Sequence, residues 1–330
     1  MSTSAPIRLG TRRSALAQAQ SGQVADALSA VLGHPVELVP ITSEGDTNRA
    51  SLSQIGGQGV FATRLREALL AGECDFLVHS LKDLPTAQPE GLVIAATPRR
   101  EDPRDVVITR GGTPLHELHT GATVGTGAPR RIAQVHRRAP HAEVVDIRGN
   151  VDSRLARVAS GELDAVILAA AGLSRLGADT PLHREELGLG EWPTAPGQGA
   201  LAVETTTDAP DWLLAGLAQL DDLPTRIAVT IEREILAGLD AGCQAPMAAH
   251  AEVTGDEVRV RAVVYQPEGD RRIGIDVTEA LNGEYIRRNG SGNGADAADD
   301  ADPMPTAVRI GRSAAHRLLE LGAADLLPRE

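Results

Sequence analysis

The chain has 330 residues, of which 42% are hydrophobic and 2% aromatic, and it carries a formal net charge of -13 at pH 7. This length suffices for two or three domains with sizeable cores, while the acidity and the shortage of aromatic stacking platforms exclude nucleic acid as a partner. Since no run approaches the roughly 20 apolar residues of a membrane span, the sequence predicts a globular, cytoplasmic protein without membrane contact.

Lysine is nearly absent: Lys82 is the only lysine among the 32 Lys and Arg residues. High acidity without lysine is typical of proteins that work in concentrated salt, so we expect a halophilic origin. Cys74 and Cys243 are too few for a disulfide framework, which favours a reducing compartment. The nine histidines show neither HxxxH nor HExxH spacing, so the sequence indicates no metal site.

The first hundred residues alternate short β-like runs with helical stretches. In chain order, the expected elements are a strand at 7–11, a helix at 14–32, a strand at 36–42, a helix at 61–72 and a strand at 76–81. This order predicts parallel strands joined by crossover helices, and therefore an α/β domain.

The same alternation recurs over residues 105–200, which predicts a second α/β domain. Its expected strands lie at 105–110, 123–127, 142–149 and 164–170, and its expected helices at 130–139 and 151–161. A helix at 226–239, strands at 257–265 and 274–280 and a last helix near 313–327 then predict a small α+β domain. Residues 288–303, rich in Gly, Asn and Asp, are expected to form a disordered surface insertion.

The segment HSLKDLP, residues 79–85, places Lys82 beside Asp83 where an apolar strand runs into a turn. Ligand sites of α/β sheets lie outside the carboxyl ends of strands, so the pair is a candidate site. The alternative is a surface ion pair of little energetic weight. His79 is expected to be a packing residue or a residue that supports the site.

Arginines gather at two strand-to-helix turns. VGTGAPRR contains Arg130 and Arg131, and DIRGNVDSR contains Arg148 and Arg154. Helix N-termini and arginine forks bind anions, so these turns predict a multiply anionic ligand, unless the arginines are merely solvated charges. A dinucleotide fingerprint is absent, because it would need glycine where Arg130 stands.

Cys243 lies in AGCQAP, a Gly-flanked loop after a helix. Its thiol is either a nucleophile or attachment point or a buried structural group; Cys74 has only the structural interpretation. The glycines of IGGQGVF, residues 55–61, indicate a flexible connection or a lid.

The ordered motifs TRRSALAQAQ, GGQGVF, HSLKDLP, REDPRD, VGTGAPRR, RGNVDSRL, LAAAGLSRLG, PGQGAL and GCQAP resemble those of porphobilinogen deaminase, also called hydroxymethylbilane synthase. The resemblance runs from about residue 7 to 265, with a weaker C-terminal continuation. It implies two α/β domains like those of periplasmic binding proteins and a small α+β C-terminal domain. The implied domains are 1–100 with 200–222, 101–199, and 223–330.

The resemblance also implies an activity. The family links four porphobilinogen molecules head to tail, releases ammonia at each step and frees hydroxymethylbilane for tetrapyrrole biosynthesis. A dipyrromethane cofactor primes the chain through a thioether, which here would form at Cys243. The resemblance implies a monomer and leaves open a handover of product to uroporphyrinogen-III synthase.

Site residues follow position by position from the matching motifs. Asp83 matches the catalytic aspartate, and Cys243, Lys82, Arg130 and Arg131 match cofactor-binding residues. The positions that match substrate-binding or polar cleft residues are Arg12, Ser14, Ser80, Arg148, Arg154, Arg175 and Gln198.

The chain departs from the family at Gln58, where lysine is usual, and at Gly127 and Ala128, where hydroxyl residues are usual. Two or more anion contacts are then either missing or supplied by backbone N–H groups. The main alternative function is a noncatalytic small-anion binding protein of the same architecture. It accounts for the arginines but not for Cys243 or the Lys82–Asp83 pair, and a silent relative of the enzyme would not need to keep Asp83 and Cys243.

Overall fold

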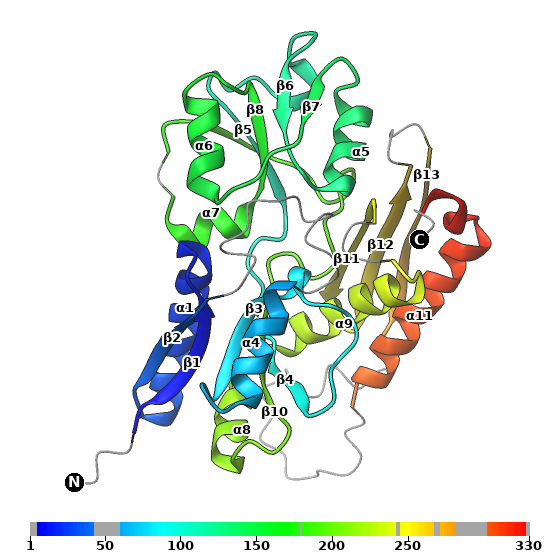
Figure 1. The fold of residues 1–330 in the computed structure, drawn as a ribbon. Coiled ribbons are helices and arrows are strands. Elements are labelled where there is room, and N and C mark those ends of the chain that lie inside the picture. Colours follow the sequence, from blue (N-terminus) through cyan, green and yellow to red (C-terminus); the bar gives the residue numbers. More distant parts are fainter. Residues whose placement is uncertain are drawn as a thin grey trace. The chain divides into compact units, whose positions relative to one another are not determined.

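The computed structural model describes residues 5–42, 60–178, 180–241, 245–266, 271–281 and 302–327. The chain forms two compact units, each of which is described by itself. The first unit comprises Met1–Pro103, Leu168–Pro181 and Gln198–Leu223, and the second comprises Arg104–Ile167, Leu182–Gly197 and Pro224–Glu330. Figure 1 labels most helices and strands of both.

The first unit is built on a five-stranded mixed sheet. In spatial order its strands are β2 (Val36–Ile41), β1 (Ile7–Arg12), β3 (Phe76–Ser80), β10 (Leu201–Thr206) and β4 (Leu92–Ala96). β1 is parallel to β2 and β3, whereas β10 is antiparallel to β3 and β4. The carboxyl ends of β1 and β3 and the start of β10 therefore meet at one edge of the sheet.

Helices cover both faces of this sheet, because alternate residues of a strand point to opposite sides. The helices are α1 (Ala15–Leu32), α4 (Val60–Leu70) and α8 (Asp211–Ala218), while α7 (Ala170–Leu176) packs against α1. Phe76 and Val78 of β3 belong to a core shared with α1 and α8, whereas Leu77 belongs to a core shared with α4.

A second five-stranded sheet repeats this arrangement in the second unit. In spatial order its strands are β7 (Glu143–Val145), β6 (Thr123–Gly125), β8 (Ala165–Ala169), β5 (Asp105–Thr109) and β9 (His183–Glu186). Its helices are α5 (Pro129–Arg138), α6 (Val151–Ala159) and the 3₁₀ turn η2 (Leu115–Glu117). Every residue of β5 is buried, as expected for a strand covered on both faces.

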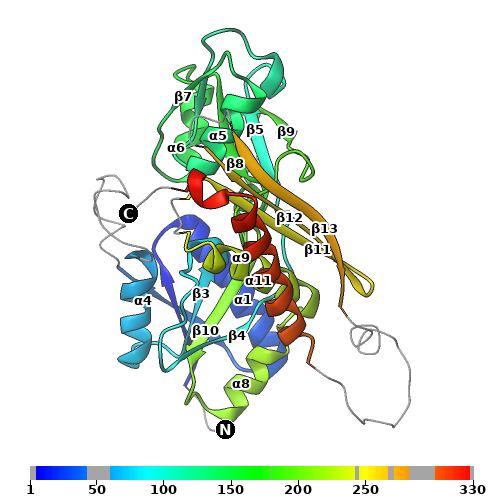
Figure 2. The ribbon, with the colours of Figure 1, turned by 90° about the vertical axis from the view of Figure 1, so that its right-hand side faces the viewer.

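The C-terminal part of the second unit is an antiparallel sheet with two long helices. The strands are β11 (Met247–Thr254), β12 (Glu257–Tyr265) and β13 (Arg272–Ala280), and the helices are α9 (Leu223–Gly238), α11 (Met304–Glu320) and the 3₁₀ turn η3 (Ala323–Leu326). Figure 2 shows α9 and α11 alongside this sheet. The helices approach closely at Gly311, where a Cβ would lie 2.8 Å from the Ile231 carbonyl oxygen.

The three-stranded sheet packs on α5 within the same unit. Ala133 of α5 forms a small core with Ala248, Val263 and Tyr265. The next residue of α5, Gln134, donates its amide to the Tyr265 hydroxyl at 3.1 Å. Helix α5, which carries Arg130 and Arg131, is thus tied to the C-terminal sheet.

The predicted α/β class with a small α+β C-terminal part is confirmed. Strands β4, β9, β10 and β11 and helices α7 and α8 are not among the predicted elements, and α11 begins before the predicted final helix. Most of the predicted insertion at 288–303 lies outside the described residues. Among the helices that are described, none is long and apolar enough to cross a membrane.

Candidate active site

The turn after β3 carries the lysine of HSLKDLP and its neighbouring acid. Leu81–Asp83 form the 3₁₀ helix η1 at the carboxyl end of the strand. The Leu81 N–H donates to the Ala200 carbonyl oxygen at 3.0 Å, and the Leu84 N–H donates back to Leu81 at 3.1 Å. Asp83 is exposed, so this backbone presents a carboxylate to solvent at the sheet edge.

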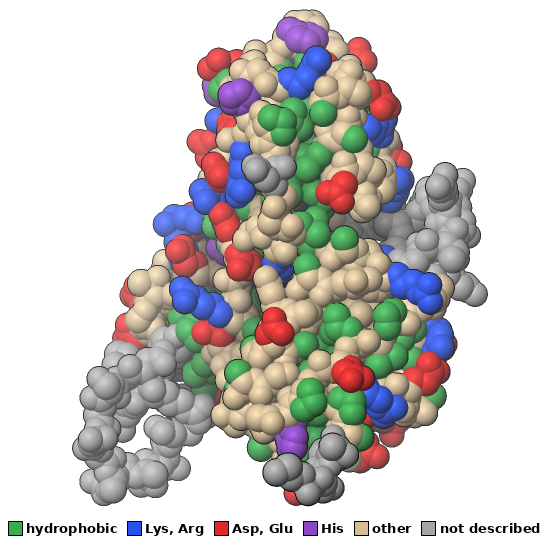
Figure 3. Space-filling model, turned by 90° about the vertical axis from the view of Figure 1, so that its left-hand side faces the viewer, with side chains coloured by type: hydrophobic (Ala, Val, Ile, Leu, Met, Phe, Trp, Pro, Cys, Tyr) green, Lys and Arg blue, Asp and Glu red, His purple; other side chains and the backbone are tan. Residues whose placement is uncertain are grey.

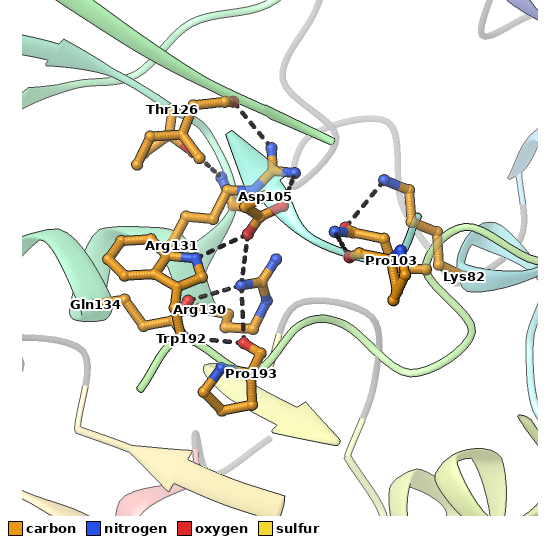
Figure 4. A network of polar contacts seen from close by, with 12 residues as sticks. Lys82, Pro103, Asp105, Thr126, Arg130, Arg131, Gln134, Trp192 and Pro193 are labelled. Atoms are coloured by element: carbon orange, nitrogen blue, oxygen red, sulfur yellow. Dashed lines mark hydrogen bonds and ion pairs between the residues drawn. The ribbon is translucent and has the colours of Figure 1, made fainter. Parts of the chain in front are cut away.

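Gln198 links this turn to the segment that enters β10. Lys82 Nζ donates to Gln198 Oε1 at 3.4 Å, and Gln198 Nε2 donates to the Pro103 carbonyl oxygen at 2.7 Å (Figure 4). Arg100 Nε donates to the Gln198 carbonyl oxygen at 2.8 Å. Gln198 is buried, and its side chain can therefore orient Lys82.

Three more predicted site residues lie at the same edge of the first sheet. Arg12 ends β1, and Ser14 caps α1, where its hydroxyl accepts the Ala17 N–H at 3.3 Å. The Ser80 hydroxyl lies 2.9 Å from the amide nitrogen of Gln20. Both serine side chains thus also support the local structure.

Arg175 of α7 reaches the same segment. Its Nη2 donates to the Gly199 carbonyl oxygen at 2.8 Å, while its Nε is buried and finds no hydrogen-bond partner in the described part of the chain. Burial lowers the pKa of the guanidinium, and the charge of Glu101 opposes this shift. A buried N–H without an acceptor is costly, so an oxygen ligand at this nitrogen would be stabilising.

In the second unit, one fully buried carboxylate holds both arginines of VGTGAPRR. Asp105 Oδ1 accepts from Arg131 Nη2 at 2.6 Å, and its Oδ2 accepts from Arg130 Nη1 and Trp192 Nε1, each at 2.9 Å (Figure 4). Asp105 is 0% exposed, and the two arginines are 5% and 7% exposed. The three charges leave a buried excess of one positive charge.

Further hydrogen bonds fix the positions of these two arginines. Arg130 Nη1 also donates to Gln134 Oε1 at 2.6 Å, and Arg131 Nη1 donates to the Ile167 carbonyl oxygen at 3.0 Å. Burial lowers the pKa of Arg130, although the charge of Asp105 opposes it. Arg131 Nε is buried without a partner among the described residues, so the network can accept an anionic oxygen.

Arg148 and Arg154 add to this positive field at α6. Arg154 Nε donates to the Gly149 carbonyl oxygen at 3.0 Å. Its pKa is lowered by burial and by the charges of Arg131 and Arg148. Arg148 Nε lies 3.8 Å from an Asp146 oxygen. Guanidinium groups gathered in this way favour a ligand with several negative charges.

One of the departures, Gly127, lies close to Asp146 and Ile147. A Cβ at Gly127 would lie 2.5 Å from Asp146 Oδ1 and 3.1 Å from the Ile147 carbonyl oxygen. A hydroxyl side chain therefore does not fit unless Asp146 moves. Gln58 and Cys243 lie outside the described residues.

Acidic and basic side chains are interspersed on the face drawn in Figure 3. In the described part of the chain, no group of three His, Cys, Asp or Glu side chains could hold a metal ion. Asp105, Gln134 and Trp192 belong to the arginine network but are not among the residues predicted from the sequence. The signal for Asp105 was an acid that opens the otherwise apolar strand DVVIT, directly after REDPRD.

Comparisons with known proteins cover almost the whole chain. The family model "Porphobilinogen deaminase, dipyromethane cofactor binding domain" matches residues 7–213, and "Porphobilinogen deaminase, C-terminal domain" matches residues 226–320. Porphobilinogen deaminase 1 of Streptomyces coelicolor is 56% identical, covering 84% of this chain and 89% of its own length. Porphobilinogen deaminase of Thermobifida fusca is 48% identical, covering 99% and 97%. Among solved structures, the methionine-binding protein MetQ is 13% identical with a TM-score of 0.40, covering 65% of this chain and 89% of MetQ.

Proposed function

This chain belongs to the porphobilinogen deaminase family, and we propose that Asp83 is the catalytic group of its reaction. The chain is a hydroxymethylbilane synthase, a transferase of tetrapyrrole biosynthesis that joins four porphobilinogen molecules and releases ammonia at each addition. The observation that supports Asp83 is its exposed carboxylate at the carboxyl end of β3, next to the lysine of the turn.

Each addition needs a carboxylate twice. The pyrrole nitrogen pushes electrons toward the aminomethyl carbon as ammonia leaves, which gives a cationic methylene-pyrrole. The Asp83 carboxylate stabilises this cation. After the free α-carbon of the growing chain has attacked the methylene, Asp83 accepts the proton that this carbon loses. One group thereby serves all four additions.

The cofactor is dipyrromethane, and we assign its attachment to the Cys243 thiol. When bound, it supplies the nucleophilic pyrrole carbon to which the first substrate is joined. Arg130, Arg131 and Lys82 would hold its carboxylates. The buried excess of positive charge around Asp105 and the unpartnered Nε of Arg131 fit such a group.

The remaining arginines would bind the acetate and propionate groups of the substrate and of the elongating chain through bidentate contacts. These arginines are Arg12, Arg148, Arg154 and Arg175. Ser14, Ser80 and Gln198 would add polar contacts. Lys82 differs from all of them, because its compact ammonium can approach a cofactor carboxylate beside Asp83 without a planar fork.

Several further properties belong to the same proposal. The domains would be 1–100 with 200–222, 101–199, and 223–330, which agrees with the start of the C-terminal family match at residue 226. The protein would be cytoplasmic and, like the family it resembles, monomeric. Its acidity and near absence of lysine support a halophilic origin. A handover of its product to uroporphyrinogen-III synthase is part of the proposal. Relatives named as deaminases do not favour the noncatalytic anion-binding alternative.

Intact mass of the denatured protein tests the proposal. Wild type should carry an excess equal to two linked pyrrole units, and Cys243→Ser should lack it. Asp83→Asn should keep the cofactor but lose turnover. A wild type that stays unmodified after incubation with porphobilinogen would refute the assignment of the cofactor and of the reaction.

A further inference from the structure

A buried carboxylate, Glu204, lies beside the segment that carries Lys82 and Asp83. Glu204 stands on β10 opposite Leu77 of β3, and it is 0% exposed. Burying a carboxylate is costly unless hydrogen bonds and opposite charge compensate. The side chains that hydrogen-bond to Glu204 therefore identify the segments that this carboxylate connects.

Three side chains from different segments meet at Glu204. Arg66 of α4 makes a fork, with Nε 2.9 Å from Oε2 and Nη2 2.8 Å from Oε1. His79 Nε2 lies 3.1 Å from Oε2, and Gln88 Nε2 donates to Oε1 at 3.1 Å. Burial acts to raise the pKa of Glu204, but hydrogen bonds from His79 and Arg66 outweigh it and lower the pKa to about 2. The carboxylate is therefore charged at neutral pH.

His79 and Gln88 lie on either side of η1 in the chain. His79 precedes η1 on β3, and Gln88 follows η1 in the loop that leads to β4. One carboxylate thus ties both ends of the segment 80–87, which contains Lys82 and Asp83. Arg66 ties helix α4 to the same point.

We infer that Glu204 is a positioning residue for Asp83: it holds both ends of the turn so that the Asp83 carboxylate keeps its place at the sheet edge. The inference rests on the catalytic role proposed for Asp83. Glu204 acts through His79, Gln88 and Arg66, and its buried side chain takes no part in the chemistry itself. Displacement of a reacting group by about 1 Å can cost about 100-fold in rate, so loss of this restraint should appear in kcat.

The test compares Glu204→Gln with Asp75→Asn as the matched control, both as holoenzymes. Glutamine keeps the size of Glu204 but loses its charge. Asp75 also pairs with an arginine, Arg8, at 2.7 Å, but it lies before β3, at the strand end remote from Asp83. The readouts are amide hydrogen exchange of residues 79–88, intact mass for cofactor content, and kcat and KM measured well below the unfolding temperatures.

In Glu204→Gln, residues 80–87 should exchange about tenfold faster, and kcat should fall about 10- to 100-fold while KM stays within about twofold. Asp75→Asn should change neither. Gln88→Met removes only the hydrogen-bond donor that follows η1, and it should show the same changes more weakly. This variant replaces Glu204→Gln in the test if Glu204→Gln does not fold. Unchanged exchange at 80–87 in the variants, or an equal fall of kcat in Asp75→Asn, would overturn the inference. Hydrogen exchange does not depend on turnover, so an inactive wild type would refute the proposed function while exchange still decided the role of Glu204.

Discussion

Replacing Asp105 by asparagine should destabilise the second unit strongly. The carboxylate accepts hydrogen bonds from Arg131, Arg130 and Trp192 at 2.6, 2.9 and 2.9 Å, and both arginines are buried. Asparagine keeps one acceptor oxygen but turns an N–H₂ group toward a guanidinium. Two buried positive charges then lack their counter-charge, and removing one partner of a buried pair costs about 3–5 kcal/mol. This is a large part of the roughly 5–15 kcal/mol by which domains are stable.

Urea unfolding followed by circular dichroism measures this loss, with Trp192→Phe as the control. The control removes one neutral donor to Asp105 and should cost about 1 kcal/mol from the hydrogen bond, while both arginine pairs remain. Cofactor content by intact mass should fall in Asp105→Asn, because Arg130 and Arg131 lose their fixed positions. A loss below about 1 kcal/mol in Asp105→Asn would refute the reasoning, since the arginines would then not need this carboxylate.

Three further predictions concern single residues. Folding lowers the pKa of Glu204 from 4.5 to about 2, so its stabilisation of about 3 kcal/mol is complete above the unfolded pKa and disappears as pH falls toward 2. The difference in unfolding free energy between wild type and Glu204→Gln should therefore shrink by about 1.4 kcal/mol from pH 7 to about 3.5, and a constant difference would contradict this. Lys82→Arg should lower both cofactor mass and turnover; normal values for both would show that a compact ammonium is not needed. Gly199→Ala should lower the midpoint of thermal unfolding, at a cost of about 1–3 kcal/mol, because the Gly199 φ is +87° and a Cβ would lie 2.6 Å from the Glu101 carbonyl oxygen; an unchanged midpoint would mean that the backbone relaxes.

Local patterns in the sequence were enough to place the turn of Lys82 and Asp83. An apolar strand that runs into a proline-limited turn predicts a sheet edge, and the structure puts η1 at the end of β3. The arginines of VGTGAPRR and DIRGNVDSR were likewise predicted at helix starts, where α5 and α6 begin. These features depend on neighbours in the chain, which is why periodicity and turn chemistry reveal them.

Pairing between distant segments was beyond such patterns. Strand β10 lies between β3 and β4, and its Leu201 pairs with Ser80, which is far away along the chain. No local signal in the sequence predicts this insertion. The roles of Asp105 and Glu204 were not predicted for the same reason, because each acid forms its ion pairs with arginines from other elements of the fold.

The position of β10 also affects the order in which the two sheets can fold during synthesis. Residues 201–206 fill the place between β3 and β4, so the first sheet stays incomplete until the ribosome has made the whole segment that forms the second sheet. A nascent chain that ends near Pro103 would leave one edge of β3 and one of β4 without a partner, and such edges favour aggregation. The second sheet, by contrast, contains only strands between residues 105 and 186. We therefore expect it to form first during translation.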